Sequence, residues 1–270
     1  MANIKRREEI ERMYDICQLT AETLEYLKSQ TIPGVTPLDL DRLANEFMTA
    51  HGAKSSTLGY RGYPNSICTA VNDVVVHGIP TNDPLKAGDL ITIDVSMYKF
   101  DFHGDKAASL IVGGVENRRA QKLMDVTEES MYRGIWEARA GGRLGSVGAA
   151  VQEHVEAAGY SVVRDLTGHG IGRQFHEDPQ VPNYGRRGTG RRLRPGLVFT
   201  VEPMVNEGSW EVDFLDDGWT VKTIDGKLSA QFEHTLAITP EGPRILTLYT
   251  DHEREMWRKE QARHDLDGSN

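Results

Sequence analysis

The 270-residue sequence is poor in cysteine, with only Cys17 and Cys68, and it has no long apolar run. Two thiols are too few for a disulfide framework in a chain of this length, so a reducing cytoplasm is the expected compartment. A membrane-spanning helix needs about 20 apolar residues in succession, and no stretch comes near that length. The charged segment at residues 1–7 has no apolar stretch behind it, and it predicts neither a secretory signal nor a transit peptide.

Positive charge is also scarce, since 31 Lys and Arg stand against 40 Asp and Glu and the formal net charge is −9. Proteins whose main ligand is nucleic acid usually present a basic face, so this balance argues against that class. One local exception is a run of five arginines interspersed with glycine: Arg186, Arg187, Arg191, Arg192 and Arg194. A solvated loop is the simpler interpretation, and a small patch that contacts a polyanion such as ribosomal RNA is the alternative.

Several common catalytic motifs are missing as well. The sequence has no His-Glu-x-x-His helix motif, because His176-Glu177 and His252-Glu253 both lack the second histidine. It also has no Gly-x-Ser-x-Gly elbow and no phosphate-binding Gly-x-x-x-x-Gly-Lys-Ser/Thr loop. These absences argue against a single-zinc helix site, a serine hydrolase elbow and a P-loop nucleotidase.

Hydrophobic periodicity predicts an α+β fold in which helices and strands occur in separate blocks. Helical spacing is found in four segments: 5–29, 36–50, 115–140 and 146–158. Strand-like segments are 90–98, a following strand that carries Gly104-Asp105, and a hairpin that pairs about 196–206 with 229–239.

The order helix, helix, strands thus occurs twice along the chain. This order predicts a duplicated α+β unit within a single catalytic domain over about 1–250, with halves of about 1–114 and 115–250. No linker or low-complexity run separates the halves. Residues 251–270 are expected to form a charged tail, in the form of a frayed helix.

Four acids occupy strand-like segments, where Asp and Glu are normally rare: Asp94, Asp105, Glu202 and Glu233. A salt bridge or a backbone hydrogen bond could hold one such acid, but four of them, two from each half, require a shared cation. His169 lies between Gly168 and Gly170, where other groups can approach closely. A histidine between glycines is usually a turn residue, but beside four strand acids it becomes a candidate metal ligand.

A site of oxygen ligands with one imidazole and no thiolate suits manganese, iron, cobalt or zinc. Carboxylates with two free oxygens can bridge two ions about 3.5–4 Å apart, the arrangement used for hydrolysis by a metal-held hydroxide. Five protein ligands exceed the three that a single catalytic zinc usually takes. The sequence therefore predicts a site for two divalent ions.

Seven motif blocks resemble those of the type I methionine aminopeptidases of the bacterial short form, and they occur in that family's order over roughly residues 5–248. They are Val75-Val76-His77-Gly78-Ile79-Pro80, Ile93-Asp94-Val95, His103-Gly104-Asp105, Gly168-His169-Gly170-Ile171-Gly172, Phe175-His176-Glu177-Asp178-Pro179, Val201-Glu202-Pro203-Met204 and Gln231-Phe232-Glu233-His234-Thr235.

The resemblance implies the pita-bread fold, in which two related halves form a curved antiparallel sheet covered by helices, with the metal site between them. It implies the ligands Asp94, Asp105, His169, Glu202 and Glu233, with Asp105 and Glu233 bridging the ions. It also implies that His77 and His176 contact the substrate peptide and that Glu202 shuttles the proton of the attacking water. The pocket for the first side chain would be lined by Tyr60, Tyr63, Cys68, Phe175 and Trp219, a wall suited to an unbranched thioether.

The implied activity is removal of the initiator methionine from nascent polypeptides when the second residue is small. The implied partners are nascent chain N-termini and, through the arginine run, a transient ribosome contact. No membrane partner is expected. A monomer is expected, since no coiled coil or apolar stripe requires a dimer.

Two residues depart from the family pattern. Lys106 follows Asp105 where the family usually has a small or hydroxyl residue, and Thr57 stands at a pocket-rim position that often carries cysteine. In a regular strand Lys106 would point away from the metals, whereas a bulge would bring its charge toward them. Two other functions stay open: a proline-directed peptidase of the same fold, and a catalytically inactive protein that binds a nascent chain or RNA.

Overall fold

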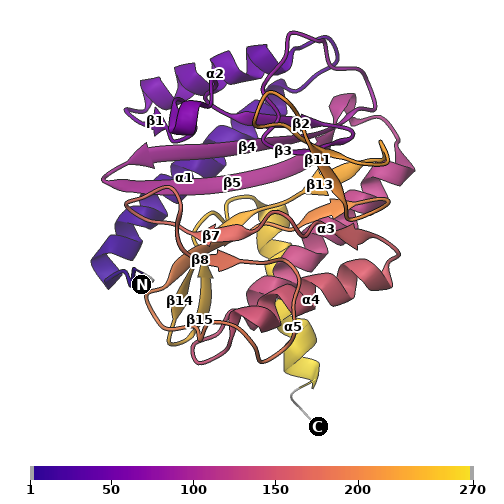
Figure 1. The fold of residues 1–270 in the computed structure, drawn as a ribbon. Helices are drawn as coiled ribbons and strands as arrows, with labels where there is room; N and C mark the ends of the chain where they lie inside the picture. The colour runs from indigo at the N-terminus through magenta and orange to yellow at the C-terminus, as the bar shows by residue number, and fades with distance from the viewer. Residues whose placement is uncertain (1–2, 268–270) are drawn as a thin grey trace.

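The first helices form where the sequence predicts them. The computed structural model describes residues 3–267, and it begins with α1 (Arg7–Gln30) and α2 (Pro37–Ala50). The Thr36 hydroxyl accepts a hydrogen bond from the Asp39 backbone N–H, and the Asp39 side chain accepts one from the Thr36 backbone, so a capping box starts α2. Helix α1 lies behind the long hairpin of the first half (Figure 1).

That hairpin consists of β4 (Leu90–Lys99) and β5 (Phe102–Ile111), which pair antiparallel in unbroken register over their whole length. Phe100 and Asp101 form the turn, and both have positive φ, as a tight two-residue hairpin turn requires. Short strands β1 (Lys54–Ser55) and β2 (Cys68–Val71) pair with β4, and β3 (Val74–Val76) joins a separate sheet.

The second half begins with α3 (Arg118–Glu137) and α4 (Leu144–Ala157), which pack against each other. The expected later hairpin is present, but it is divided into two short ladders. Strand β9 (Val198–Val201) pairs with β14 (His234–Thr239), and β10 (Met204–Asn206) pairs with β13 (Ser229–Gln231). The residues between the ladders include Glu202 and Glu233, so the interruption falls where the predicted acids lie.

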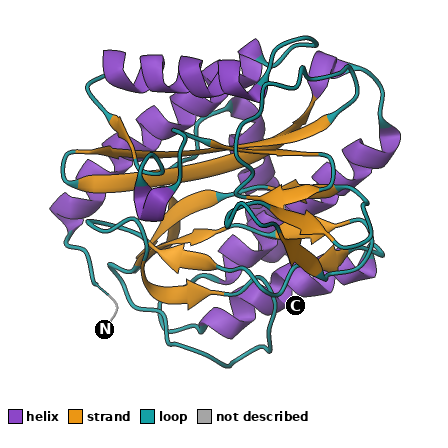
Figure 2. Cartoon of the chain, turned by 45° about the horizontal axis from the view of Figure 1, so that its top comes forward, coloured by secondary structure: helices purple, strands orange, loops and turns teal. Residues whose placement is uncertain are grey.

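The remaining elements are short: η1 (Tyr60–Gly62), η2 (Val112–Gly114), β6 (Ser161–Val162), β7 (Gly168–Gly170), β8 (Glu177–Val181), β11 (Val212–Phe214), β12 (Val221–Thr223) and β15 (Gly242–Ile245). Helices lie on the outer sides of the two groups of strands (Figure 2). The α+β prediction is therefore confirmed. None of the helices within residues 3–267 is long and apolar enough to cross a membrane.

The expectation of a frayed helix at the C-terminus is wrong for the described part of that segment. Helix α5 (Asp251–Asp267) is continuous and packs against α3. The Trp257 ring lies 6.0 Å from that of Trp136, and the ring of His264 stacks on Trp136 at 4.4 Å. The charged composition of the segment gives no indication of these aromatic contacts, which help to hold the helix to the domain.

Candidate metal centre and substrate cavity

One cavity of about 980 Å³ contains all of the site residues that the sequence predicts. Its lining includes the five candidate ligands, the two candidate substrate histidines and the five residues of the expected side-chain pocket: Asp94, Asp105, His169, Glu202, Glu233, His77, His176, Tyr60, Tyr63, Cys68, Phe175 and Trp219. Residues more than 100 positions apart in the sequence thus converge at one place, as a shared site requires.

The β4–β5 register brings two of the acids to one face of the hairpin. Ser96 lies opposite Asp105, and side chains two residues apart on a strand share a face, so Asp94 and Asp105 point to the same side. The Ser96 hydroxyl donates to Asp105 Oδ1 at 2.7 Å. This face forms part of the cavity wall.

His169 is presented by β7, which lies between β8 and β9. A side chain at Gly170 would collide with the backbone carbonyl of Asp178, so the glycine is needed for the close packing of these strands. His169 Nδ1 donates to the Gly170 carbonyl oxygen at 2.9 Å, which turns Nε2 toward the acids. Nε2 lies 3.5 Å from Asp105 Oδ2 and 3.8 Å from Glu202 Oε1.

The last two acids come from the interrupted ladders. Thr200, at the end of β9, donates to Glu202 Oε1 at 2.7 Å. The Glu233 backbone N–H donates to the carbonyl oxygen of Ala107 at 2.9 Å, which ties the second-half strands to β5. The acids of the two halves are therefore fixed relative to one another by backbone hydrogen bonds.

The buried acids fit a site for cations. Among the described residues, Asp94 Oδ1 and Glu233 Oε1 are buried without a hydrogen-bond partner. One ligand atom each from Asp105, His169 and Glu233 lies within 4.8 Å of the others. Leaving such acceptors unpaired is costly, and divalent cations held by carboxylates and an imidazole would satisfy them.

The pKa values of the buried acids also indicate a site for cations. Burial, and then the Asp105 carboxylate, raise the pKa values of Asp94 and Glu233 well above the usual range. Burial also raises the pKa of Glu202, to about 7. Buried carboxyl groups that oppose one another's ionisation indicate a site that bound cations complete.

Two histidines face the cavity as neutral imidazoles. Burial lowers the pKa of His77 to about 4 and that of His176 to about 3. His77 adopts φ of 56°, a strained conformation for a residue other than glycine, of the kind that functional sites retain. The His176 ring stacks on Tyr60 at 5.1 Å and lies 4.1 Å from the His169 ring. Both imidazoles can therefore donate an N–H hydrogen bond without carrying charge.

Aromatic rings form the wall of the expected side-chain pocket. Tyr60 meets Phe175 edge-on at 5.1 Å, and Tyr63 meets Trp219 edge-on at the same distance. The Tyr63 hydroxyl donates to the Gly78 carbonyl oxygen at 2.9 Å, which fixes the ring. Burial, and then Asp94, raise the pKa of the Cys68 thiol well above its usual range, so Cys68 is a neutral, polarizable part of the wall.

Sequence reasoning missed three hydroxyl residues that hold the acids. Besides Ser96 and Thr200, the Thr235 hydroxyl donates to the Asp105 carbonyl oxygen at 2.8 Å. Each of the three stands two residues from a candidate ligand in the sequence, as Asp94-x-Ser96, Thr200-x-Glu202 and Glu233-x-Thr235. For Asp94 and Ser96, which both lie in β4, this spacing puts the two side chains on one strand face, so it was a usable signal there.

The two departures from the family pattern are compatible with the site. β5 has no bulge at Asp105, so Lys106 points to the opposite face and the regular-strand alternative holds. Thr57 lines the cavity, but its hydroxyl donates to the Ser66 carbonyl oxygen at 2.7 Å. Neither residue blocks the acids.

Comparison with known proteins agrees with this geometry. The sequence pattern of metallopeptidase family M24 matches residues 11–240. The chain belongs to metallopeptidase family M24, the class of enzyme that its fold and its buried acids also indicate.

Within that family the chain is similar to methionine aminopeptidases. Methionine aminopeptidase A of Synechocystis sp. is 52% identical over 243 residues, which are 90% of this chain and 96% of the relative. The crystal structure of methionine aminopeptidase from Rickettsia prowazekii superposes with a TM-score of 0.90 at 45% identity, covering 92% of this chain and 100% of that one. The prolidase from Pyrococcus horikoshii shares the fold alone, with a TM-score of 0.73 at 20% identity, 92% coverage of this chain and 64% of that one. The pita-bread prediction is confirmed.

Proposed function

We propose that the chain removes the N-terminal methionine of nascent proteins when the second residue is small, using two divalent ions held by Asp94, Asp105, His169, Glu202 and Glu233. The observation that carries the proposal is the convergence of these buried acids, two with unpartnered oxygens, on a cavity walled by aromatic rings. The named methionine aminopeptidases at about half sequence identity support the choice of substrate.

When bound, divalent ions in such a site lower the pKa of water and polarise the scissile carbonyl. Glu202 would take a proton from the attacking water and return it to the leaving amine, as a general base and then a general acid. His77 and His176 would donate N–H groups to the peptide and to the oxygen on which negative charge develops. The free amine of the substrate would lie beside Asp94.

The aromatic wall would select the first side chain. Tyr63 and Trp219 would offer their rings, and Cys68 a polarizable sulfur, to an unbranched thioether. The acids and histidines fix the peptide bond at one end of the cavity. A bulky second residue would then meet these fixed side chains, which accounts for the small-residue rule that we propose.

The test is release of free methionine from Met-Ala-Ser and Met-Leu-Ser by metal-stripped protein to which manganese, cobalt, iron or zinc is returned. We expect metal-dependent cleavage of Met-Ala-Ser and at least about 100-fold slower cleavage of Met-Leu-Ser, the order of discrimination that pocket contacts supply. Equal cleavage of both peptides would refute the specificity, and no cleavage by folded protein with any of the ions would refute the activity.

We further propose that the enzyme acts as a cytoplasmic monomer near the ribosome, since its substrate emerges there. The five arginines of the predicted patch are all exposed: Arg186, Arg187, Arg191, Arg192 and Arg194. Arg187 donates to Glu137 at 2.8 Å and to Glu153 at 2.7 Å, so its charge is already countered. The attraction to RNA would therefore come from the other four.

Replacing Arg186, Arg191 and Arg192 together with Gln is expected to lower co-sedimentation with ribosomes at low salt several-fold, because each lost phosphate contact weakens binding. Cleavage of short peptides should not change. Arg187→Gln is the matched control and should sediment nearly like the wild-type protein. Unchanged sedimentation of the triple variant would remove the ribosome contact.

A further inference from the structure

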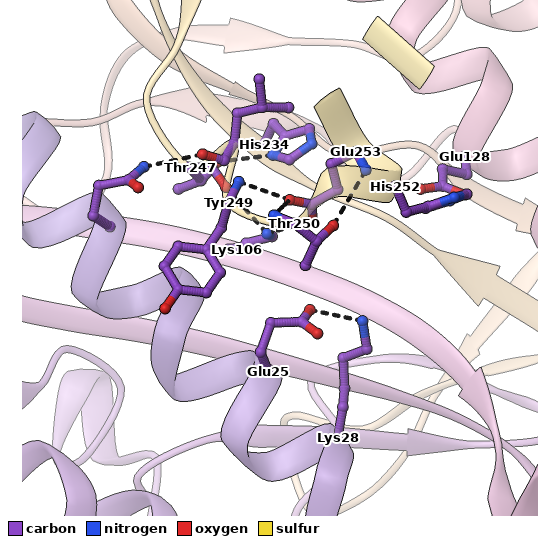
Figure 3. A network of polar contacts seen from close by, with 12 residues as sticks. Glu25, Lys28, Lys106, Glu128, His234, Thr247, Tyr249, Thr250, His252 and Glu253 are labelled. Atoms are coloured by element: carbon purple, nitrogen blue, oxygen red, sulfur yellow. Dashed lines mark hydrogen bonds and ion pairs between the residues drawn. The ribbon is translucent and has the colours of Figure 1, made fainter. Parts of the chain in front are cut away.

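The strand that carries Asp105 toward the cavity carries Lys106 toward the opposite side. The Lys106 side chain is only 1% exposed, in the interior behind the sheet. Its Nζ donates to Glu253 Oε1 at 2.5 Å and to the Thr247 carbonyl oxygen at 3.1 Å (Figure 3). A lysine buried this fully is stable only with such partners, so the back of β5 is attached to the segment before α5 and to α5 itself.

The strand that follows Glu233 is attached to the same segment. His234 is 1% exposed, and its Nδ1 lies 2.8 Å from the Thr247 hydroxyl. The Thr247 hydroxyl also accepts from the Thr235 backbone N–H at 3.1 Å. Thr247 therefore bonds the start of β14 through its hydroxyl and Lys106 of β5 through its carbonyl, so one short segment contacts both of these strands (Figure 3).

Glu253 also caps the N-terminus of α5. The Thr250 hydroxyl accepts from the Glu253 backbone N–H at 3.2 Å, and Glu253 Oε2 accepts from the backbone N–H groups of Thr250 at 3.0 Å and Tyr249 at 2.8 Å. This is a capping box in which the acid has a second oxygen free for Lys106. Burial acts to raise the pKa of Glu253, but the Lys106 ammonium, His234 and the backbone hydrogen bond from Thr250 together outweigh it, and the pKa falls to about 2.

We infer that Glu253 is a positioning residue for the proposed metal centre, acting through Lys106 and Thr247 on β5, which carries Asp105, and on β14, which directly follows Glu233. The inference rests on the proposed function. The side chains that bind a metal must be held to within about 0.5 Å of their binding positions. Contacts that fix a strand on its far side keep the ligand on that strand in position. The M24 family match ends at residue 240, so Thr247 and Glu253 belong to a part of the chain beyond that match.

Loss of the Glu253 charge leaves a buried ammonium without its partner. Lys106 then has to turn toward water or toward another acid, and Glu25 and Glu128 both line the cavity of about 400 Å³ behind β5. Either movement would shift β5 at the residue next to Asp105. Replacing Lys106 with Met as well removes the charge, and the methionine can pack among Met124, Met131 and Phe232 of the same cavity.

The experiment titrates metal-stripped, full-length protein with Co²⁺ by calorimetry, and records the visible absorption spectrum of the bound ion. Glu253→Gln is expected to weaken Co²⁺ binding about 10- to 100-fold and to alter the spectrum, the range found when a residue that supports metal ligands is changed. The double variant Lys106→Met/Glu253→Gln should return to within about threefold of the wild type, because no unpaired ammonium is left. Glu260→Gln is the matched control: Glu260 is another buried acid of α5, bonded to Arg263 and His264 on the same helix, and its loss should leave Co²⁺ binding unchanged.

A lower melting temperature of Glu253→Gln with unchanged Co²⁺ affinity and spectrum would overturn the inference, because it would show a purely structural ion pair. If Glu253→Gln does not fold, Glu253→Asp replaces it. That variant keeps the charge but cannot both reach Lys106 and cap α5, so about 10-fold weaker binding is expected and wild-type affinity would equally overturn the inference. Failure of the wild-type protein to bind Co²⁺ would instead remove the proposed metal centre, and the inference with it.

Discussion

Glu233→Gln is expected to make the metal-stripped protein more stable and the enzyme at least about 100-fold less active. Glu233 Oε1 is buried without a partner, and Asp105, Glu202 and Asp94 all oppose its ionisation. A glutamine amide has the same shape, carries no charge and can donate to these carboxylates. An unsatisfied buried acceptor costs about 1–3 kcal/mol, so the free energy of unfolding of the stripped protein should rise by an amount of that order.

Added metal should reverse this order of stability. An ion that binds only the folded protein stabilises it by RT ln(1 + [L]/Kd), about 2.7 kcal/mol at 100 times Kd, and the variant forfeits most of this gain. The measurement is thermal unfolding of both proteins with a chelator and then with excess Mn²⁺. Glu241→Gln, at an exposed position beyond β14, is the control and should behave like the wild type in both conditions. A variant that gains as much from Mn²⁺ as the wild type would exclude Glu233 as a ligand.

His176→Ala is expected to lower kcat by about 10²- to 10³-fold on Met-Ala-Ser with a small change in KM. Burial keeps the pKa of His176 at about 3, so the ring faces the cavity as a neutral N–H donor. A donor aimed at the oxygen on which charge develops stabilises the transition state more than the bound substrate, and removal of one such donor costs that factor. Steady-state kinetics with saturating metal separates the two constants.

The control for this variant is His51→Ala, since His51 is exposed at the end of α2 and does not line the cavity. Its kinetics should equal those of the wild type. His176→Gln should recover part of the lost rate, because the amide keeps an N–H donor. Loss of affinity alone, with kcat unchanged in His176→Ala, would show that His176 only binds substrate.

The sequence predicted the site better than it predicted what supports the site. Asp94 and Asp105 stood out because ionisable groups are costly in strands, and His169 because its neighbours are glycines. Their convergence on one cavity depends on strand register, which the alternation of apolar residues determines. The motif resemblance added the pocket residues, which composition alone does not distinguish from ordinary core aromatics.

The tertiary contacts that support the site were harder to predict from the sequence. Glu253 and Lys106 are 147 positions apart, and no local pattern predicts that they meet. The charged composition of residues 251–270 resembles that of a solvated helix, whereas the packing of Trp257 on Trp136 and the Lys106–Glu253 ion pair show that α5 is docked. The predicted hairpin was found, but its division at Glu202 and Glu233 was not foreseen, because an interruption of one or two residues leaves the hydrophobic pattern almost unchanged.

The central claim is that the buried acids hold two divalent ions, and anomalous diffraction from crystals grown with excess Mn²⁺ tests it most directly. We predict two anomalous peaks in the cavity, both within bonding distance of Asp105 and Glu233, with His169 bound to one of them. Data collected at wavelengths above and below the manganese edge identify the metal. No peak in the cavity, or a single peak that does not touch Asp105 and Glu233, would contradict the account.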